Sequence, residues 1–208
     1  MIKIVGICGS PRNESTEYAL RQALEAATAV GAETQLITLR RKTLNFCIHC
    51  NKCINEGKDY CILHNDDMTP LYQPFYEADG YLIASPVYDM GITGQLATFF
   101  SRFRATYTRL KDDQKYYSAK VGGALAVGGT RNGGQESTIN CILNFYHTLG
   151  VTVVNGGMGC YGGAAIWSQD KKAQGAKEDL IGIKNARLMG EKVAEIAKVM
   201  KNYRSKEV

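Results

Sequence analysis

The stretch Ile2–Thr16, "IKIVGICGSPRNEST", decides the fold because it joins a short apolar run to a polar loop and then to the start of a helix. The run from Ile2 to Cys8 is short, apolar and followed by Gly9, which predicts a buried strand. The residues that follow place apolar side chains at the i, i+3, i+4 and i+7 spacing of one helix face, namely Leu20, Ala23, Leu24 and Ala27. A strand, a loop and a helix in this order form the repeating unit of parallel α/β sheets.

The ends of this first helix carry residues with known capping preferences. Asn13 and Ser15 are candidate N-caps, because their side-chain oxygens can accept hydrogen bonds from the first free backbone amides. Gly31 is expected to end the helix as a C′ glycine.

The rest of the chain alternates in the same way. Further strands are expected at 33–39, 80–85, 120–127 and 151–157, with helices at 66–79, 95–107 and 135–150 and a long final helix from 177 to about 203. Five strands alternating with helices predict an α/β protein with a doubly wound parallel sheet covered on both faces. Its length and strand count favour the flavodoxin-like order 2-1-3-4-5.

Two segments show no helix-like or strand-like spacing of apolar residues and are expected to be irregular, 45–65 and roughly 158–176. The first is a cysteine-rich loop inserted after strand two. The second contains Tyr161 and Trp167 and is expected to form either a lid or subunit contact, or a simple surface loop.

The composition bounds the class of protein. A chain of 208 residues is expected to form one domain, 1–208, which buries about 70% of its unfolded surface and needs no disulfides. The net charge of +5 is mild and dispersed, which gives no indication of nucleic-acid binding. The N-terminus lacks signal-peptide features, and no window approaches the roughly 20 apolar residues of a membrane helix. We therefore expect a cytoplasmic protein with reduced thiols.

The loop "GSPRNEST" after the first strand has the composition of a phosphate site. Its donors are Ser10, Asn13, Ser15 and Thr16, and Arg12 adds a cation. Free amides and the helix dipole favour an anion at this position. The loop matches neither the G-x-G-x-x-G fingerprint nor the P-loop, so a phosphate monoester such as that of FMN fits better than a pyrophosphate. The alternative is a plain turn with a helix cap.

Two further loops are expected at the same sheet edge, because the carboxyl ends of parallel strands meet there. In "SPVYDMGITGQL", residues 85–96, Pro86, Val87 and Tyr88 offer an apolar wall and an aromatic face for a flat ring. In "GGTRNGGQE", residues 128–136, glycines allow backbone to approach a ligand closely. Backbone amides near a flavin can hydrogen-bond its ring.

Four cysteines fall in the loop after strand two, at Cys47, Cys50, Cys53 and Cys61. The spacing C-x2-C-x2-C-x7-C is similar to runs that bind iron–sulfur clusters, so a [4Fe–4S] cluster is the favoured ligand. A zinc ion, or no metal, stays open, because thiolates suit both metals. Seven cysteines in a reducing compartment make disulfides the weakest interpretation. His49 and His64 are expected to be loop residues and not ligands.

The motifs "GSPRxxS", "SPVYxxxxxGQ" and the glycine-rich third loop together resemble those of the NADPH-dependent FMN reductases, over roughly residues 1–160. The resemblance implies FMN as cofactor. It implies a phosphate site of Ser10, Arg12, Asn13, Ser15 and Thr16, an isoalloxazine wall of Pro86, Val87, Tyr88 and Asp89, and a second edge of Gly129, Thr130 and Gly133.

With the cysteine motif added, the chain is similar to the iron–sulfur flavoproteins of anaerobic archaea and bacteria. This resemblance implies a homodimer or homotetramer with FMN and a [4Fe–4S] cluster in each subunit. It implies electron transfer from a donor such as ferredoxin through the cluster to FMN, and on to a small acceptor such as O2 or H2O2. No side chain is expected to act as a separate catalytic residue.

Two other functions stay open from the sequence. One is an NAD(P)H-dependent FMN or quinone reductase without an iron–sulfur cluster. The other is a non-enzymatic electron carrier like flavodoxin, although flavodoxins are usually acidic and this chain carries +5.

Overall fold

The computed structural model describes residues 1–204, so the last four residues of the predicted domain lie outside the described residues. Its strands are β1 (Ile2–Cys8), β2 (Ala32–Thr38), β3 (Gly80–Pro86), β4 (Val121–Gly128), β5 (Thr152–Val153) and β6 (Ala164–Trp167). Its helices are α1 (Ser15–Ala29), α2 (Lys52–Asn55), α3 (Thr69–Glu77), α4 (Gly94–Arg102), the 3-10 turn η1 (Phe103–Thr106), α5 (Tyr107–Asp112), α6 (Gln135–Leu149), α7 (Lys172–Glu178) and α8 (Leu180–Arg204).

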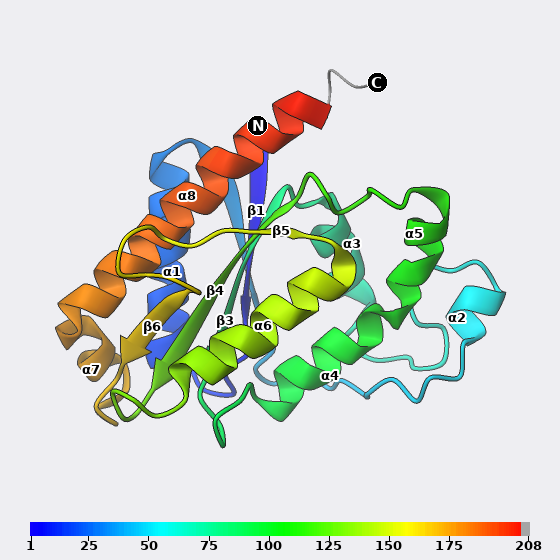
Figure 1. The fold of residues 1–208 in the computed structure, drawn as a ribbon. Helices are drawn as coiled ribbons and strands as arrows, with labels where there is room; N and C mark the ends of the chain where they lie inside the picture. The colour runs from blue at the N-terminus through cyan, green and yellow to red at the C-terminus, as the bar shows by residue number, and fades with distance from the viewer. Residues whose placement is uncertain (205–208) are drawn as a thin grey trace.

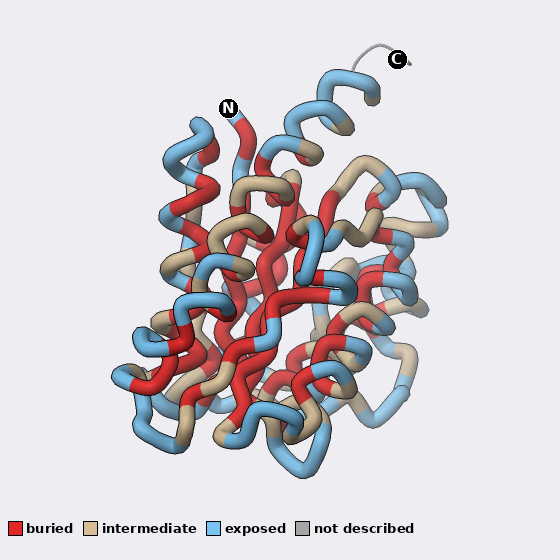
Figure 2. Tube along the Cα trace, turned by 60° about the vertical axis from the view of Figure 1, so that its left-hand side comes forward, coloured by how far each residue is buried: buried red, intermediate tan, exposed pale blue. Residues whose placement is uncertain are grey.

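The strands form one parallel sheet in the order β2-β1-β3-β4-β5, which confirms the predicted flavodoxin-like topology. Helices α1 and α8 cover one face, and α3, α4 and α6 cover the other (Figure 1). All residues of β3 and β4 are buried, and the buried trace runs through the centre of the molecule in Figure 2. This central position explains why both strands are nearly continuous apolar runs.

The fifth strand differs from the prediction. Only Thr152–Val153 pair with the start of β4, whereas β6 pairs with its end, from Leu125 to Gly128. The two short strands therefore share one edge position, and the chain between them leaves the sheet through Gly157 and Gly159, both at positive φ. The expectation that 158–176 is irregular was wrong, because this segment contains β6 and most of α7. Its glycine-rich start hides the strand from a periodicity argument.

Three helix boundaries also differ. Glu14, and neither Asn13 nor Ser15, holds the N-cap position of α1, and within the described part of the chain its side chain forms no capping hydrogen bond. The expected helix 95–107 is divided among α4, η1 and the first residue of α5, and the final helix begins at Leu180. Buried Asp179 accounts for that start, because its carboxylate accepts hydrogen bonds from the amides of Trp167 and Gly182, at 2.7 and 3.1 Å. Gly31 ends α1 with a φ of +93°, as predicted.

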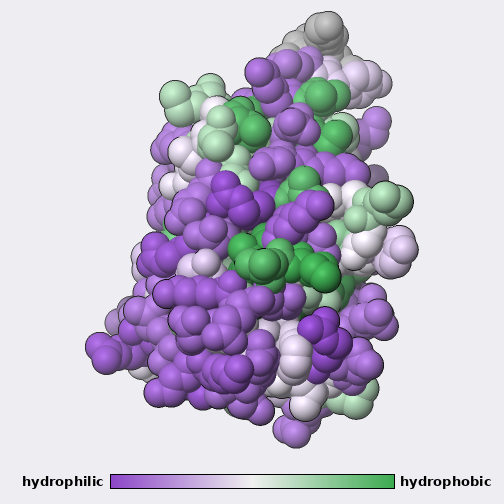
Figure 3. Space-filling model, turned by 90° about the vertical axis from the view of Figure 1, so that its left-hand side faces the viewer, coloured by the Kyte–Doolittle hydropathy of each residue, from purple (hydrophilic) through white to green (hydrophobic). Residues whose placement is uncertain are grey.

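The layer of α1 and α8 packs closely. A Cβ atom added at Gly190 in α8 would collide with the carbonyl group of Ala23 in α1, so the two helix backbones approach each other there. The outer face of this side is largely hydrophilic, with hydrophobic patches between the polar side chains (Figure 3). Within residues 1–204, no helix has both the length and the apolar character that crossing a lipid bilayer requires.

Candidate functional site

The loops after β1 and β3 are held together by one threonine. The Thr93 hydroxyl donates to the carbonyl oxygen of Gly9 at 2.7 Å and accepts from the amide of Leu96 at 3.2 Å. The Gly9 amide in turn donates to Ala84 O at 2.8 Å. Thr93 is thus both the N-cap of α4 and the link that fixes the start of the predicted phosphate loop.

The predicted phosphate residues surround the N-terminus of α1. Buried Ser10 closes a tight turn, since its Oγ donates to Arg12 O and accepts from Arg12 N, at 2.9 and 3.1 Å. Ser15 and Thr16 are buried in the first turn of α1, whereas Arg12 and Asn13 are exposed. With its amide turned so that the nitrogen faces Glu17, Asn13 donates to both carboxylate oxygens of Glu17, at 3.2 and 3.0 Å.

Two charged residues near this loop were missed from the sequence. Glu17 is buried in α1 and pairs with Arg21 at 2.6 Å and with Arg40 at 3.6 Å. Arg40 follows β2, and its buried Nε atom has no hydrogen-bond partner within the described residues. The basic run Arg40–Lys42 after strand two was the available signal for a second cation at this edge of the sheet.

The second loop presents its predicted residues in a tight turn. Pro86 ends β3, and the Val87 amide donates to Val127 O at 2.9 Å. Tyr88 and Gly91 exchange backbone hydrogen bonds of 3.0 and 2.8 Å, and Asp89 occupies the left-handed region with a φ of 47°. Tyr88 is partly exposed. The loop therefore offers a partly exposed aromatic ring at a tight backbone turn.

The third loop, residues 128–136, is supported by the segment 158–176, to which the sequence assigned no definite role. The Trp167 indole donates to Gly129 O at 2.8 Å. A side chain at Gly129 would collide with Asp170, and one at Gly133 would collide with Thr130. Thr138 at the start of α6 donates to Gly91 O at 3.0 Å, which joins this loop to the second one. Trp167 is thus a sheet residue that supports the loop and not part of a lid.

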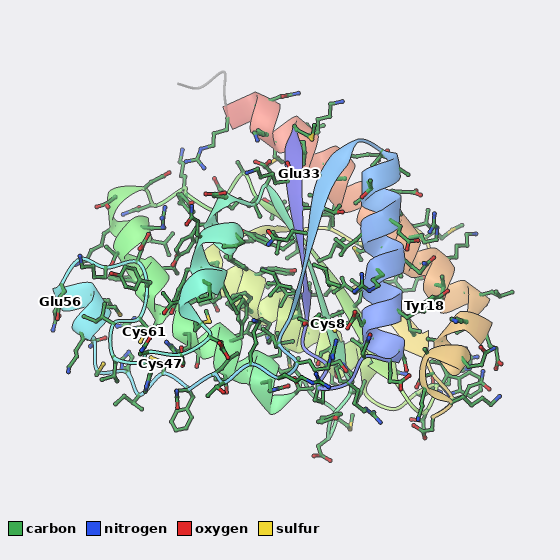
Figure 4. All side chains as sticks on the ribbon, turned by 180° about the vertical axis from the view of Figure 1, so that it is seen from behind. Cys8, Tyr18, Glu33, Cys47, Glu56 and Cys61 are labelled. Atoms are coloured by element: carbon green, nitrogen blue, oxygen red, sulfur yellow. The ribbon has the colours of Figure 1, made fainter. Side chains whose placement is uncertain are left out.

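The four cysteines of the inserted loop line one small hollow. Figure 4 shows Cys47 and Cys61 near each other on the side of α2, apart from Cys8, which marks the start of the phosphate loop. His49 and Asn51, on either side of Cys50, have positive φ values of 57° and 58°. These two residues turn the backbone on both sides of Cys50, in a conformation that Asn and His adopt more readily than most residues other than glycine.

The base of this loop is closed by a buried ion pair. Arg102, at the end of α4, donates from Nη1 to Asn45 O at 2.7 Å and to Asp66 Oδ2 at 2.6 Å. The Asn45 amide also donates to Asp66 Oδ2, at 2.9 Å. Residues 45 and 66 therefore meet at one guanidinium, and the cysteines lie between them. Further out, Cys47 N donates to Ser101 Oγ and Cys61 N donates to Tyr72 Oη, at 3.1 and 3.3 Å.

Burial and charge act together on the groups in this region. Burial alone would raise the pKa of Asp66, but hydrogen bonds from Arg102 and Asn45 outweigh it and hold the pKa at about 2. Burial raises the pKa of the Cys53 thiol, and the neighbouring Cys61, Cys47 and Cys50 raise it further. The thiolate form of Cys53 is thus disfavoured in the free protein, and a bound metal cation would stabilise it.

Two residues that line the hollow have unpaired polar atoms that a bound group could satisfy. His64 Nε2 and Arg102 Nε are buried without a hydrogen-bond partner among the residues that the structure describes, and both residues line the hollow. In residues 1–204, no three or more His, Cys, Asp or Glu side chains are already arranged around a metal position. The fit therefore rests on four soft thiol donors and two unpaired nitrogen atoms around one space, and not on a preformed coordination geometry.

The fold and its three loops define a flavodoxin-like protein, and comparison with known proteins agrees. The sequence profile of the NADPH-dependent FMN reductase family matches residues 2–162. The chain is 42% and 40% identical to two iron–sulfur flavoproteins of Methanocaldococcus jannaschii, covering 96% and 95% of this chain and 100% and 98% of those proteins. It is 34% identical to an iron–sulfur flavoprotein of Methanosarcina thermophila, over 99% of this chain and 100% of that one.

The chain therefore belongs to the iron–sulfur flavoprotein family, within the NADPH-dependent FMN reductases. This membership confirms the prediction of a flavin-dependent oxidoreductase. The family is described as an FMN reductase family, and the relatives are named iron–sulfur flavoproteins. Both predicted cofactors, FMN and an iron–sulfur cluster, are thereby confirmed.

Solved structures confirm the fold alone. RosB with bound 8-demethyl-8-formylriboflavin-5′-phosphate has a TM-score of 0.71 at 19% identity, covering 97% of this chain and 81% of that one. A flavodoxin from the domain Archaea has a TM-score of 0.58 at 13% identity, covering 95% of this chain and 99% of that one.

Replacing Thr93 with valine should weaken both the fold and the flavin site. The variant loses the α4 cap and leaves the Gly9 carbonyl unpaired, so the free energy of unfolding should fall by about 1–2 kcal/mol. FMN should also dissociate more readily, which urea titration and flavin fluorescence would measure. Thr98→Val in the body of α4 is the matched control and should leave FMN affinity unchanged. Equal FMN affinity in both variants would contradict this role of Thr93.

Proposed function

We propose that this protein is an iron–sulfur flavoprotein oxidoreductase that passes electrons from a donor such as ferredoxin, through a [4Fe–4S] cluster, to FMN and on to a small acceptor such as O2 or H2O2. The observation that carries the proposal is the single hollow lined by Cys47, Cys50, Cys53 and Cys61. This hollow lies near the C-terminal end of α4, whereas the N-terminal end of the same helix supports the loop predicted to bind the flavin. Family membership supports the same assignment.

Each element has a defined task in this proposal. Ser10, Ser15 and Thr16 with the first amides of α1 bind the FMN phosphate, and Arg12 and Asn13 close over it. Pro86, Val87, Tyr88 and Asp89 line one side of the ring, and Gly129, Thr130 and Gly133 line the other. The cluster exchanges single electrons and the flavin stores two, so the protein couples one-electron to two-electron chemistry. Four free thiols that bind iron suit a reducing compartment such as the cytoplasm.

Serine substitutions test the ligand set. Replacing any one of Cys47, Cys50, Cys53 or Cys61 should greatly lower iron and acid-labile sulfide in anaerobically purified protein and leave FMN bound, because the thiols and the flavin loops belong to different elements. Cys141→Ser in α6 is the matched control and should retain about four irons per FMN. If the wild-type protein holds FMN but no iron, the proposal is wrong. The alternative is then an NAD(P)H-dependent FMN or quinone reductase, an activity of the kind that the description of the matched family names.

The position of the cysteine loop favours electron transfer between subunits. The loop lies beyond α4 from the phosphate loop, and Phe46 and Ile48 beside Cys47 are 67% and 58% exposed. Apolar side chains exposed this far indicate a contact surface. We therefore include in the proposal a homodimer or homotetramer in which this loop packs near the flavin of a neighbouring subunit.

The double variant Phe46→Asp/Ile48→Asp tests that packing. It should dissociate the oligomer and slow cluster-to-FMN electron transfer at least tenfold, while iron and FMN contents stay normal. Sedimentation velocity and stopped-flow absorbance would measure the two effects. Leu180→Asp, an exposed apolar residue at the start of α8, is the control. An unchanged oligomer with unchanged transfer would contradict the proposed packing.

The surface near the cysteines also fits an acidic donor. Lys52 and Lys58 are exposed on the cysteine loop, and Lys52 lines the hollow. Opposite charges on donor and acceptor increase the association rate, and added salt screens this effect.

Charge reversal at these lysines should therefore impair reduction by ferredoxin. Lys52→Glu/Lys58→Glu should lower the second-order rate about tenfold at low salt and flatten its salt dependence. Lys184→Glu, on α8 at the other side of the molecule, should change neither (Figure 1). Rates that do not depend on salt in the wild-type protein would argue against electrostatic docking of this donor.

A further inference from the structure

One nitrogen atom of the Arg102 guanidinium, Nε, has no acceptor within residues 1–204. Its side chain is fully buried, with 0% exposed, at the end of α4. Nη1 and Nη2 are bound to Asp66 and to Asn45 O, whereas Nε has no partner in the described part of the chain. A buried donor without an acceptor costs about 1–3 kcal/mol. Because Arg102 lines the cysteine hollow, a group bound in that hollow can supply the missing acceptor.

The backbone of Arg102 is also connected to a cysteine. The Tyr72 hydroxyl donates to Arg102 O at 2.9 Å and accepts from the Cys61 amide at 3.3 Å. Asp66 and Tyr72 thus hold both the guanidinium and the main chain of Arg102 in place beside Cys61. A cation fixed in this way loses little rotamer freedom when it forms one more hydrogen bond.

The guanidinium charge is oriented with respect to the hollow. Both guanidinium–carboxylate contacts use Nη1 and Nη2, so the unpaired Nε belongs to the part of the guanidinium that Asp66 leaves free. Asp66 itself does not line the hollow, whereas Arg102 does. A group in the hollow therefore experiences the cation more strongly than its counter-ion, and low local polarity strengthens that effect.

We propose that Arg102 sets the reduction potential of the cluster by donating a hydrogen bond from Nε to a sulfur atom of the cluster or of Cys61, and by placing its positive charge beside them. This inference rests on the proposed function, because it requires a cluster in the hollow. Reduction adds one negative charge to the cluster, so a fixed cation and a hydrogen bond to sulfur both favour the reduced state and raise the potential.

The test is an EPR-monitored redox titration of anaerobically purified holoprotein. Arg102→Gln should lower the equilibrium constant for one-electron reduction of the cluster about tenfold, a change of about −59 mV. Asp66→Asn, which removes the counter-ion and keeps the guanidinium, should shift the potential in the opposite direction. Arg109→Gln is the matched control. Arg109 also pairs with a carboxylate, that of Asp59, and its buried Nε has no partner in residues 1–204, but Arg109 does not line the hollow.

Opposite signs separate this role from a structural one. If Arg102 only supported the loop, Arg102→Gln and Asp66→Asn would both loosen it and shift the potential in the same direction. Such a result, or an equal shift in Arg109→Gln, would overturn the inference. If Arg102→Gln does not fold, the double variant Arg102→Gln/Asp66→Asn replaces it, because it removes both charges together. This double variant should still lower the reduction potential of the cluster. An unchanged potential would overturn the inference. A wild-type protein without iron would refute the proposed function instead.

Discussion

The buried pair of Arg102 and Asp66 is the contact on which the organisation of the cysteine loop depends. It joins the chain before the cysteines, at Asn45, to the chain after them, and it attaches both to α4. Breaking such a pair by removing one partner is costly, about 3–5 kcal/mol, because the remaining charge stays buried. The loop contains one short helix, α2, and is otherwise irregular. Its shape is therefore set by contacts with its base and with α3, α4 and α5, and not by its own secondary structure.

Helix α4 connects the two candidate sites. Thr93 at its N-terminus fixes the start of the predicted phosphate loop, and Arg102 at its C-terminus closes the cysteine loop. Nine residues span only about 13 Å at 1.5 Å per residue, so one short rigid element relates both sites. The edge strand makes a similar contribution on the other side, where β6 and Trp167 hold the third loop at Gly129. The loops predicted to bind the flavin are thus supported by α4 on one side and by β6 on the other.

Sequence reasoning succeeded where the signal was local. The apolar runs predicted β1 to β4, Gly31 marked the end of α1, and the loops after β1, β3 and β4 meet as parallel topology requires. It failed where the outcome depended on distant contacts. The strand β6 follows a glycine-rich segment and forms only because β4 offers a free edge. Arg102 and Asp66 are 36 residues apart, and charged residues are rarely fully buried, so nothing in the sequence indicated their pairing.

The central claim is that a cluster bound by the four cysteines exchanges electrons with FMN in one protein. Stepwise anaerobic reduction of the holoprotein, followed by visible and EPR spectra on the same sample, tests it most directly. The account predicts an uptake of about three electrons per subunit, two by FMN and one by the cluster, with both signals changing in the same titration. An uptake of about two electrons per subunit, with no EPR signal from a reduced cluster, would contradict it.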